Sequence, residues 1–82
     1  MIAEQTNWAD IAHTEISPRT PISKPYRHVL RHGVAWGGGN EYVVHTQTID
    51  DKAYHSGHYT ESILNAVSIL NRRAKRDGLR IK

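Results

Sequence analysis

The chain has 82 residues, which is the size of one domain, and a domain of this size buries only about 60–65% of the surface of its unfolded form. It contains no cysteine, so disulfides and thiolate metal sites are excluded. No apolar run approaches the ~18 residues that a membrane span needs, and the N-terminus lacks the basic and apolar regions of a signal peptide. We therefore expect a soluble cytoplasmic protein without a deep, water-free active site.

Net charge is +3, and its distribution along the chain is uneven. Residues 1–71 hold five Lys and Arg against seven Asp and Glu, whereas residues 72–82 hold six against one. The basic character is therefore a C-terminal block on a slightly acidic body. Six histidines add positive charge below their usual pKa of about 6.5, so binding driven by charge is expected to depend on pH.

Residues 1–25 are expected to form an N-terminal arm and a connector. Residues 1–5 should fray, and Asn7 is a candidate cap for one helical turn through Trp8, Ile11 and Ala12. That turn is too short to be stable alone, so the arm is expected to lie along the body. Three prolines make residues 17–25 an extended connector, because each fixes φ and restricts its predecessor: Pro18, Pro21 and Pro25.

Residues 26–59 alternate in the manner of antiparallel strands. The first strand is predicted over residues 26–36, with this more apolar face toward the core: Tyr26, His28, Leu30, His32, Val34 and Trp36. Residues 37–40, Gly-Gly-Gly-Asn, are the turn. A second strand is predicted over residues 41–49, and its pattern does not decide which of its two faces is buried. Asp50-Asp51 predicts another turn before a short third strand over residues 52–59, broken at Ser56-Gly57.

Residues 60–78 have the clearest helical period in the chain. The expected apolar stripe is Ile63, Ala66, Val67, Leu70 and Ala74, widened by Leu64, with Ile69 off it. Thr60 is the candidate N-cap, Glu61 lies in the predicted first turn, and Gly78 is the expected left-handed end. Residues 79–82 are expected to be a mobile tail. The pattern predicts an α+β fold: a two- to three-stranded antiparallel meander packed against one C-terminal helix.

The basic block is the first candidate site. Arg72, Arg73, Lys75 and Arg76 are expected on the helix face opposite the apolar stripe, and Arg80 follows on the tail. One interpretation is a solvated helix end that complements the helix dipole. The other is a binding surface for nucleic acid or for an acidic protein. We expect no dedicated DNA-binding motif, since no helix-turn-helix, zinc-finger or RNA-recognition signature is present.

Two histidines and one tryptophan complete the candidate binding residues. His55 and His58 are interpreted as strand and turn histidines that make hydrogen bonds or face a partner, and Trp36, beside the glycine turn, as an interface anchor. A zinc site of His45, His55 and His58 is the alternative, although no ordered ligand frame accompanies it. His28 and His32 are separated by about 13 Å on a strand, too far to share a metal. We therefore predict no metal and no cofactor.

Catalytic and phosphate-binding patterns are weak. The glycine run lacks the Lys-Ser/Thr pair of a P-loop and no helix follows it. Ser56 and Ser62 have histidines near them in sequence, but no nucleophile elbow or ordering acid accompanies them. We therefore expect a binding protein and not an enzyme.

The short cysteine-free domain and the segment HSGHYTESILNAVSILNRRA resemble the small inhibitors that bacteriophages and mobile elements encode, anti-CRISPR proteins in particular. That group shares a function and no motif, so the resemblance assigns no residue. It implies a steric mechanism, in which the protein occupies a CRISPR effector complex in the host cytoplasm and blocks DNA binding or nuclease recruitment. Many members are acidic DNA mimics, and the basic terminus here departs from that pattern. The alternative function is a small nucleic-acid-binding regulator that uses the basic helix end.

Overall fold

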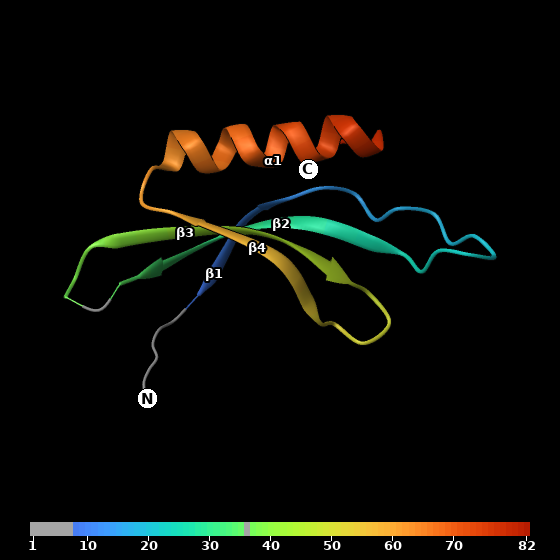
Figure 1. Ribbon diagram of the computed structural model, residues 1–82, viewed down its shortest axis with the longest axis horizontal. Helices are drawn as coiled ribbons and strands as arrows, with labels where there is room; N and C mark the ends of the chain where they lie inside the picture. The colour runs from blue at the N-terminus through green and yellow to red at the C-terminus, as the bar shows by residue number, and fades with distance from the viewer. Residues whose placement is uncertain (1–7, 36) are drawn as a thin grey trace.

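The computed structural model describes residues 8–35 and 37–82, and in it one helix covers one face of a four-stranded antiparallel sheet (Figure 1). The strands are β1 (Ala9–His13), β2 (Tyr26–Val34), β3 (Asn40–Thr48) and β4 (Tyr54–Thr60), and the helix is α1 (Ile63–Asp77). The strands lie side by side in chain order, so the sheet is a meander. The predicted α+β class is confirmed, with one strand more than expected.

The additional strand is β1, and the helical turn predicted there is wrong. Residues 9–13 pair antiparallel with β2, with Ala9 opposite His32 and His13 opposite Val29, and a bulge lies between Asp10 and Ala12. One isolated helical turn gains little hydrogen bonding, whereas the edge of β2 offers a row of backbone partners. The predicted cap Asn7 and residues 1–5 lie outside the described residues.

Both predicted turns are confirmed. Gly37 and Gly38 adopt φ values of 99° and 95°, which glycine reaches at little cost, and they close the β2–β3 hairpin. In the β3–β4 turn, the Asp51 carboxylate accepts hydrogen bonds from the Thr48 hydroxyl and, at 3.1 Å, from the Ala53 N–H. The first strand ends at Val34, two residues earlier than predicted.

The predicted break at Ser56-Gly57 is a bulge within β4 and does not end the strand. The register between β3 and β4 shifts between Val44 and Thr46, and Ser56 has a φ of 55°. A bulge of this kind adds a residue to one strand and increases its local twist.

Helix α1 begins later than predicted and ends where predicted. Its N-cap is Ser62, whose hydroxyl accepts a 3.1 Å hydrogen bond from the Asn65 N–H, so Thr60 and Glu61 precede the helix. Gly78 has a φ of 68°, and the Leu79 N–H donates to the Ala74 carbonyl at 2.9 Å. This is the left-handed Schellman end that the sequence indicated.

The main core lies between α1 and the centre of the sheet. Leu30 and Val44 on the strands pack with Ala66, Ile69 and Leu70 on the helix. Ile69 is only 5% exposed, so its predicted place off the buried stripe is wrong. Ala66, Leu70 and Ala74 are buried as predicted, whereas Ile63 and Val67, also predicted on the stripe, are exposed, because the buried face is rotated toward Ile69.

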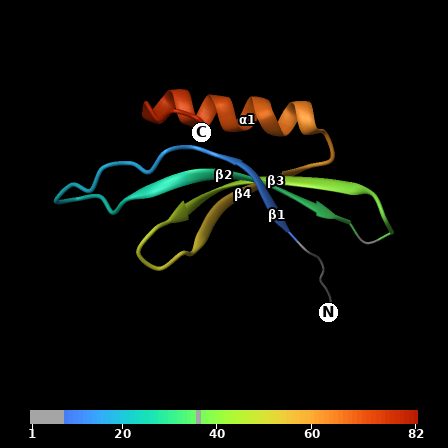
Figure 2. The ribbon, with the colours of Figure 1, turned by 180° about the vertical axis from the view of Figure 1, so that it is seen from behind.

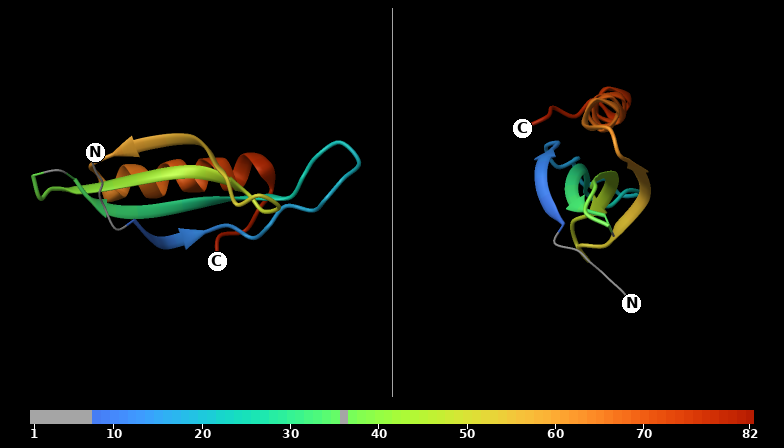
Figure 3. Two further views of the ribbon diagram at one scale, coloured as in Figure 1. Left: turned by 90° about the horizontal axis from the view of Figure 1, so that it is seen from below. Right: turned by 90° about the vertical axis from the view of Figure 1, so that its left-hand side faces the viewer.

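The opposite face of the sheet is also buried at its centre, although no helix covers it. Val29 and Val43 have almost no exposed surface. The outer strands bend away from α1 (Figure 3), so Trp8 beside β1 and Tyr59 on β4 meet edge to face with ring centroids 6.1 Å apart. The expectation of one buried face on the first strand is therefore incomplete, because the curvature of the sheet creates a second cluster.

The C-terminal tail is paired, and the expectation of a mobile tail is wrong. Thr14 and Ile81 form an antiparallel bridge, and the Lys82 N–H donates to the His13 carbonyl at 2.8 Å. The tail thus extends the sheet beyond β1, and the C-terminus lies beside the segment that follows β1 (Figure 2; Figure 3). The predicted connector, residues 17–25, is extended as expected, with a tight turn between Thr20 and Ser23.

Candidate functional site

The C-terminal end of α1 gathers most of the cations that the sequence indicated. Arg72, Lys75 and Arg76 are exposed on the helix, and Arg80 is exposed on the tail. In residues 8–35 and 37–82, no carboxylate forms an ion pair with the side chain of Arg72, Lys75 or Arg80. These three side chains are thus available to an external anion.

Arg73 differs from the other cations because it points toward β4. Its Nη2 donates a 2.8 Å hydrogen bond to the Ser56 carbonyl in the bulge, and its Nη1 is buried without a partner among the described residues. Burial lowers the pKa of Arg73. The expectation that Arg73 lies opposite the buried stripe is wrong, because the stripe is centred closer to Ile69 than the sequence indicated.

Arg76 is exposed but partly engaged within the protein. Its Nε and Nη2 donate to the two carboxylate oxygens of Asp77, at 3.0 and 3.2 Å. The side chain of Arg76 remains 65% exposed, so the guanidinium can still meet a partner from outside.

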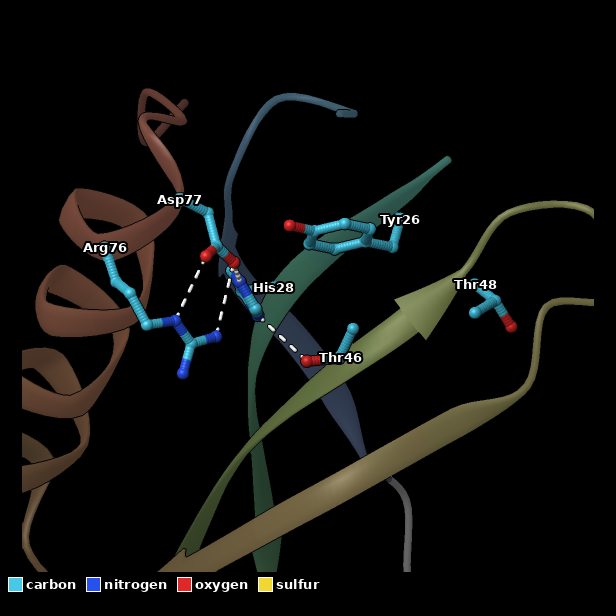
Figure 4. A pocket seen from close by; sticks show the side chains of 6 residues that line it. All are labelled: Tyr26, His28, Thr46, Thr48, Arg76 and Asp77. Carbon is cyan, nitrogen blue, oxygen red and sulfur yellow. Dashed lines mark hydrogen bonds and ion pairs between the residues drawn. The ribbon is translucent and has the colours of Figure 1, made fainter. Parts of the chain in front are cut away.

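A polar pocket of about 330 Å³ lies beneath this end of the helix (Figure 4). Strand alternation places Tyr26 and His28 of β2, and Thr46 and Thr48 of β3, on the sheet face under α1. The last helical turn brings Arg76 and Asp77 over them. The lining residues are Tyr26, His28, Thr46, Thr48, Arg76 and Asp77.

A chain of hydrogen bonds crosses the pocket from helix to sheet. His28 Nε2 lies 2.7 Å from Asp77 Oδ2, and Thr46 Oγ1 lies 3.0 Å from His28 Nδ1 (Figure 4). An ionised carboxylate only accepts, so His28 Nε2 carries the proton in this arrangement. The bond from Arg76, and to a smaller extent that from His28, holds the pKa of Asp77 well below its usual range. Burial, aided by the Asp77 carboxylate, raises the pKa of Tyr26.

The connectivity of acid, imidazole and hydroxyl is that of an acid–base relay. Here, however, the His28 ring is only 1% exposed and both of its nitrogens are occupied. A general base has to reach the proton that it removes. We therefore interpret the chain as a clamp that ties the end of α1 to the sheet and positions the basic residues beside it.

The histidines singled out from the sequence do not converge. His55 and His58 lie on the face of β4 that looks toward the helix, opposite Thr46 and Val44, and His55 Nε2 is 3.3 Å from Thr48 Oγ1 at the pocket. His45 lies on the other face, stacked on Tyr54 with ring centroids 4.3 Å apart. The alternative of a zinc site built from His45, His55 and His58 is therefore wrong. The predicted anchor Trp36 lies outside the described residues.

Sequence reasoning missed the clamp. His28 was placed correctly on the buried face of its strand, but Asp77 is 49 residues away, and its position depends on the packing angle of the helix. The only available signal was the one acid within the basic block. It also missed the cluster on the other face, where the Arg31 guanidinium stacks 4.8 Å from the Tyr54 ring centroid and pairs with Asp10 at 2.9 Å.

Comparisons with known proteins identify no relative of this chain. No family model matches the chain, and neither a curated protein nor a solved structure is significantly similar to it.

Proposed function

We propose that the protein is a non-enzymatic binding protein that docks its basic helix end onto an acidic surface of a larger complex. The observation that carries the proposal is a group of cations, Arg72, Lys75 and Arg80, that form no ion pair with the residues that the structure describes, beside the half-engaged Arg76. They project from the last two turns of α1 and from the tail, which the clamp and the β1 pairing hold in place. Because the backbone that carries these cations is held in place, binding costs little backbone entropy, and only the exposed side chains lose rotamer freedom.

The finer proposal is that the partner is a host defence complex. In this view a bacteriophage or mobile element encodes the protein, which acts in the host cytoplasm, occupies a CRISPR effector, and blocks its DNA binding or nuclease recruitment. A small domain with its charge at one end suits steric blocking, in which a few Arg and aromatic anchors supply most of the affinity. His55 and His58, on the exposed strand β4, are proposed as further contacts. Within the described residues, no helix has the length and apolar character to cross a bilayer.

The alternative is a nucleic-acid-binding regulator that uses the same basic end. Three or four phosphate contacts would give a log–log slope of affinity against salt of about −3 to −4 on B-DNA. The Asp77 carboxylate and the slightly acidic body repel phosphate and acidic protein alike, so the salt dependence of binding is what separates the two proposals.

The deciding experiment compares two variants of equal charge change. The first variant, Arg72→Ala/Lys75→Ala/Arg80→Ala, removes the three cations of the proposed surface. The control variant, Arg19→Ala/Lys24→Ala/Lys52→Asn, removes three exposed cations elsewhere. Asparagine replaces Lys52 because it tolerates the positive φ at that position. Binding to purified CRISPR effector complexes is measured by co-elution and by protection of a plasmid from cleavage.

Loss of co-elution and of protection in the first variant alone is the expected result. Equal effects of both variants would show a nonspecific charge effect and would contradict a defined surface. Fluorescence anisotropy with duplex and single-stranded oligonucleotides, titrated with salt, tests the alternative. If log affinity falls steeply with log salt concentration, and this slope becomes shallower only in the first variant, the basic end binds nucleic acid and the alternative function is favoured.

A further inference from the structure

No element that the structure describes covers the side of α1 that faces away from the sheet (Figure 1), and a row of exposed residues lies there. Beginning one residue before the N-cap, the row advances in steps of three and four, and all of its members are exposed: Glu61, Leu64, Ser68, Asn71 and Lys75. This is the spacing of a helix seam that packs against another helix. Leu64, at 80% exposed, is the most solvent-accessible apolar side chain of the helix, and Ile63 and Val67 flank it.

The residues of this row do not serve the fold of the monomer. The face that packs on the sheet is formed by Ala66, Ile69, Leu70 and Ala74. Glu61 and Lys75 form no ion pair with any residue that the structure describes. The row has one apolar member, Leu64, with Ile63 and Val67 beside it, and unpaired charges of opposite sign lie at its two ends; such a charge pattern is complementary to a second copy of itself.

We infer that this row is the interface of a symmetric dimer, in which α1 packs antiparallel against α1 of a second copy. The order of charge along the row selects this occupant. In an antiparallel pair centred on Ser68, Glu61 of each copy meets Lys75 of the other, whereas a parallel pair would oppose like charges. The same surface serves both copies, as a two-fold axis requires.

The side chains between the two charges suit close packing. Ser68 lies at the axis, and its small side chain lets the two helices approach. Leu64 of each copy then lies over Val67, Asn71 and the aliphatic stem of Arg72 in the other copy. Because the row faces away from the sheet, the sheets lie on the outside, giving a sheet–helix–helix–sheet arrangement. The apolar surface formed by Leu64, Ile63 and Val67 is small. The interface therefore falls below the ~1,200 Å² of a standard complex, and the dimer is weak.

The dimer adds a property that the monomer lacks. Lys75 is used in the pair with Glu61, whereas the guanidinium groups of Arg72, Arg76 and Arg80 stay at the edge of the interface, so the dimer presents two basic ends formed by these arginines. They are separated by about the length of the 15-residue helix, ~22 Å at 1.5 Å per residue. Two linked contacts bind more tightly than one when a partner offers acidic surfaces at that spacing.

Sedimentation equilibrium of the full chain, from about 10 µM to about 1 mM in low salt, tests the inference. The wild type should show a monomer–dimer equilibrium. Leu64→Glu should abolish it, and Glu61→Lys and Lys75→Glu should each weaken dimerisation about 5- to 10-fold. The double variant Glu61→Lys/Lys75→Glu should restore it, because the exchanged charges again face opposite charges.

The matched control is Ile22→Glu, which puts the same charge on a 97%-exposed residue of the connector and should leave dimerisation unchanged. Far-UV circular dichroism and urea unfolding confirm that each variant is folded, as is expected for exposed positions. A wild type that stays monomeric at about 1 mM overturns the inference. So does a Leu64→Glu variant that still dimerises, or a double exchange that restores nothing.

Discussion

His45 is a titratable side chain that the fold keeps uncharged. It lies on the sheet face away from α1, and its Nε2 is buried without a hydrogen-bond partner among the described residues. Burial, and then the positive charges of Arg31 and Arg73, lower the pKa of His45 to about 4, with Asp10 acting in the opposite direction. An imidazole in this position destabilises the fold whenever it has to be protonated.

This residue predicts how stability depends on pH. Between pH 6.5, the usual pKa, and about 4, the unfolded chain binds a proton at His45 and the folded chain does not. The free energy of unfolding therefore falls as pH falls through this window. In His45→Gln, urea unfolding midpoints between pH 7 and 4 should vary less with pH than in the wild type. His58→Gln, on an exposed strand position, is the control, and an unchanged slope in His45→Gln would contradict the assignment.

The stability that Asp77 contributes also falls as pH falls, but at lower pH than for His45, and it predicts the energy of the clamp. Its lowered pKa means that its stabilisation is present above the usual value of 3.8 and is lost as pH falls below it. Asp77→Asn leaves buried His28 without a charged partner and should cost about 1–3 kcal/mol in urea unfolding at pH 7. Asp50→Asn, which breaks the exposed pair with Arg19, should cost less than about 1 kcal/mol. Similar losses in both variants would show that the clamp does not stabilise the helix end.

At the scale of elements, the sequence predicted those features that depend on local chemistry. The glycine turn, the Asp51 turn and the Gly78 helix end each follow from residues that tolerate or stabilise one backbone conformation. Strand β1 and the rotation of α1 did not follow, because both depend on distant partners. The 9–13 segment has no strong period of its own, and the apolar arc from Ile63 to Leu70 allows more than one buried face. The basic part of the candidate site was predictable, whereas the clamp required the tertiary fold.

The contact between β1 and β2 predicts a strict need for glycine at position 33. A Cβ built at Gly33 would lie 2.9–3.0 Å from three atoms of the Trp8 ring, closer than side chains pack. Gly33→Ala should displace Trp8 and cost about 1–3 kcal/mol in urea unfolding, with a red shift of tryptophan emission. Gly39→Ala is the control, because nothing lies within 4 Å of its Cβ position. Equal stability of the two variants would contradict the packing of Trp8 on Gly33.

At the scale of the whole molecule, Trp8 and the C-terminal tail each contact a segment that is distant in sequence. Trp8 reaches across the curved sheet to Tyr59, and the tail returns from the helix to pair beside His13 and Thr14. Both contacts join segments far apart in sequence, which explains why sequence patterns did not reveal them. They cover the second face of the sheet and part of the free edge of β1, and unpaired strand edges promote aggregation.

Removing residues 80–82 therefore tests how much the contacts of the tail contribute. The deletion removes the hydrogen bond from the Glu15 N–H to the Arg80 carbonyl at 2.7 Å, that from the Lys82 N–H to the His13 carbonyl at 2.8 Å, and the Glu15 carboxylate contact of the Arg80 N–H at 2.9 Å. We expect a loss of about 2–3 kcal/mol in urea unfolding, faster hydrogen exchange at the Glu15 amide, and more aggregation. Arg80→Ala/Lys82→Ala removes the same two charges but keeps the backbone bonds, so its stability should stay close to that of the wild type. If the deletion and the double substitution unfold at the same urea concentration, the backbone pairing of the tail does not stabilise the fold.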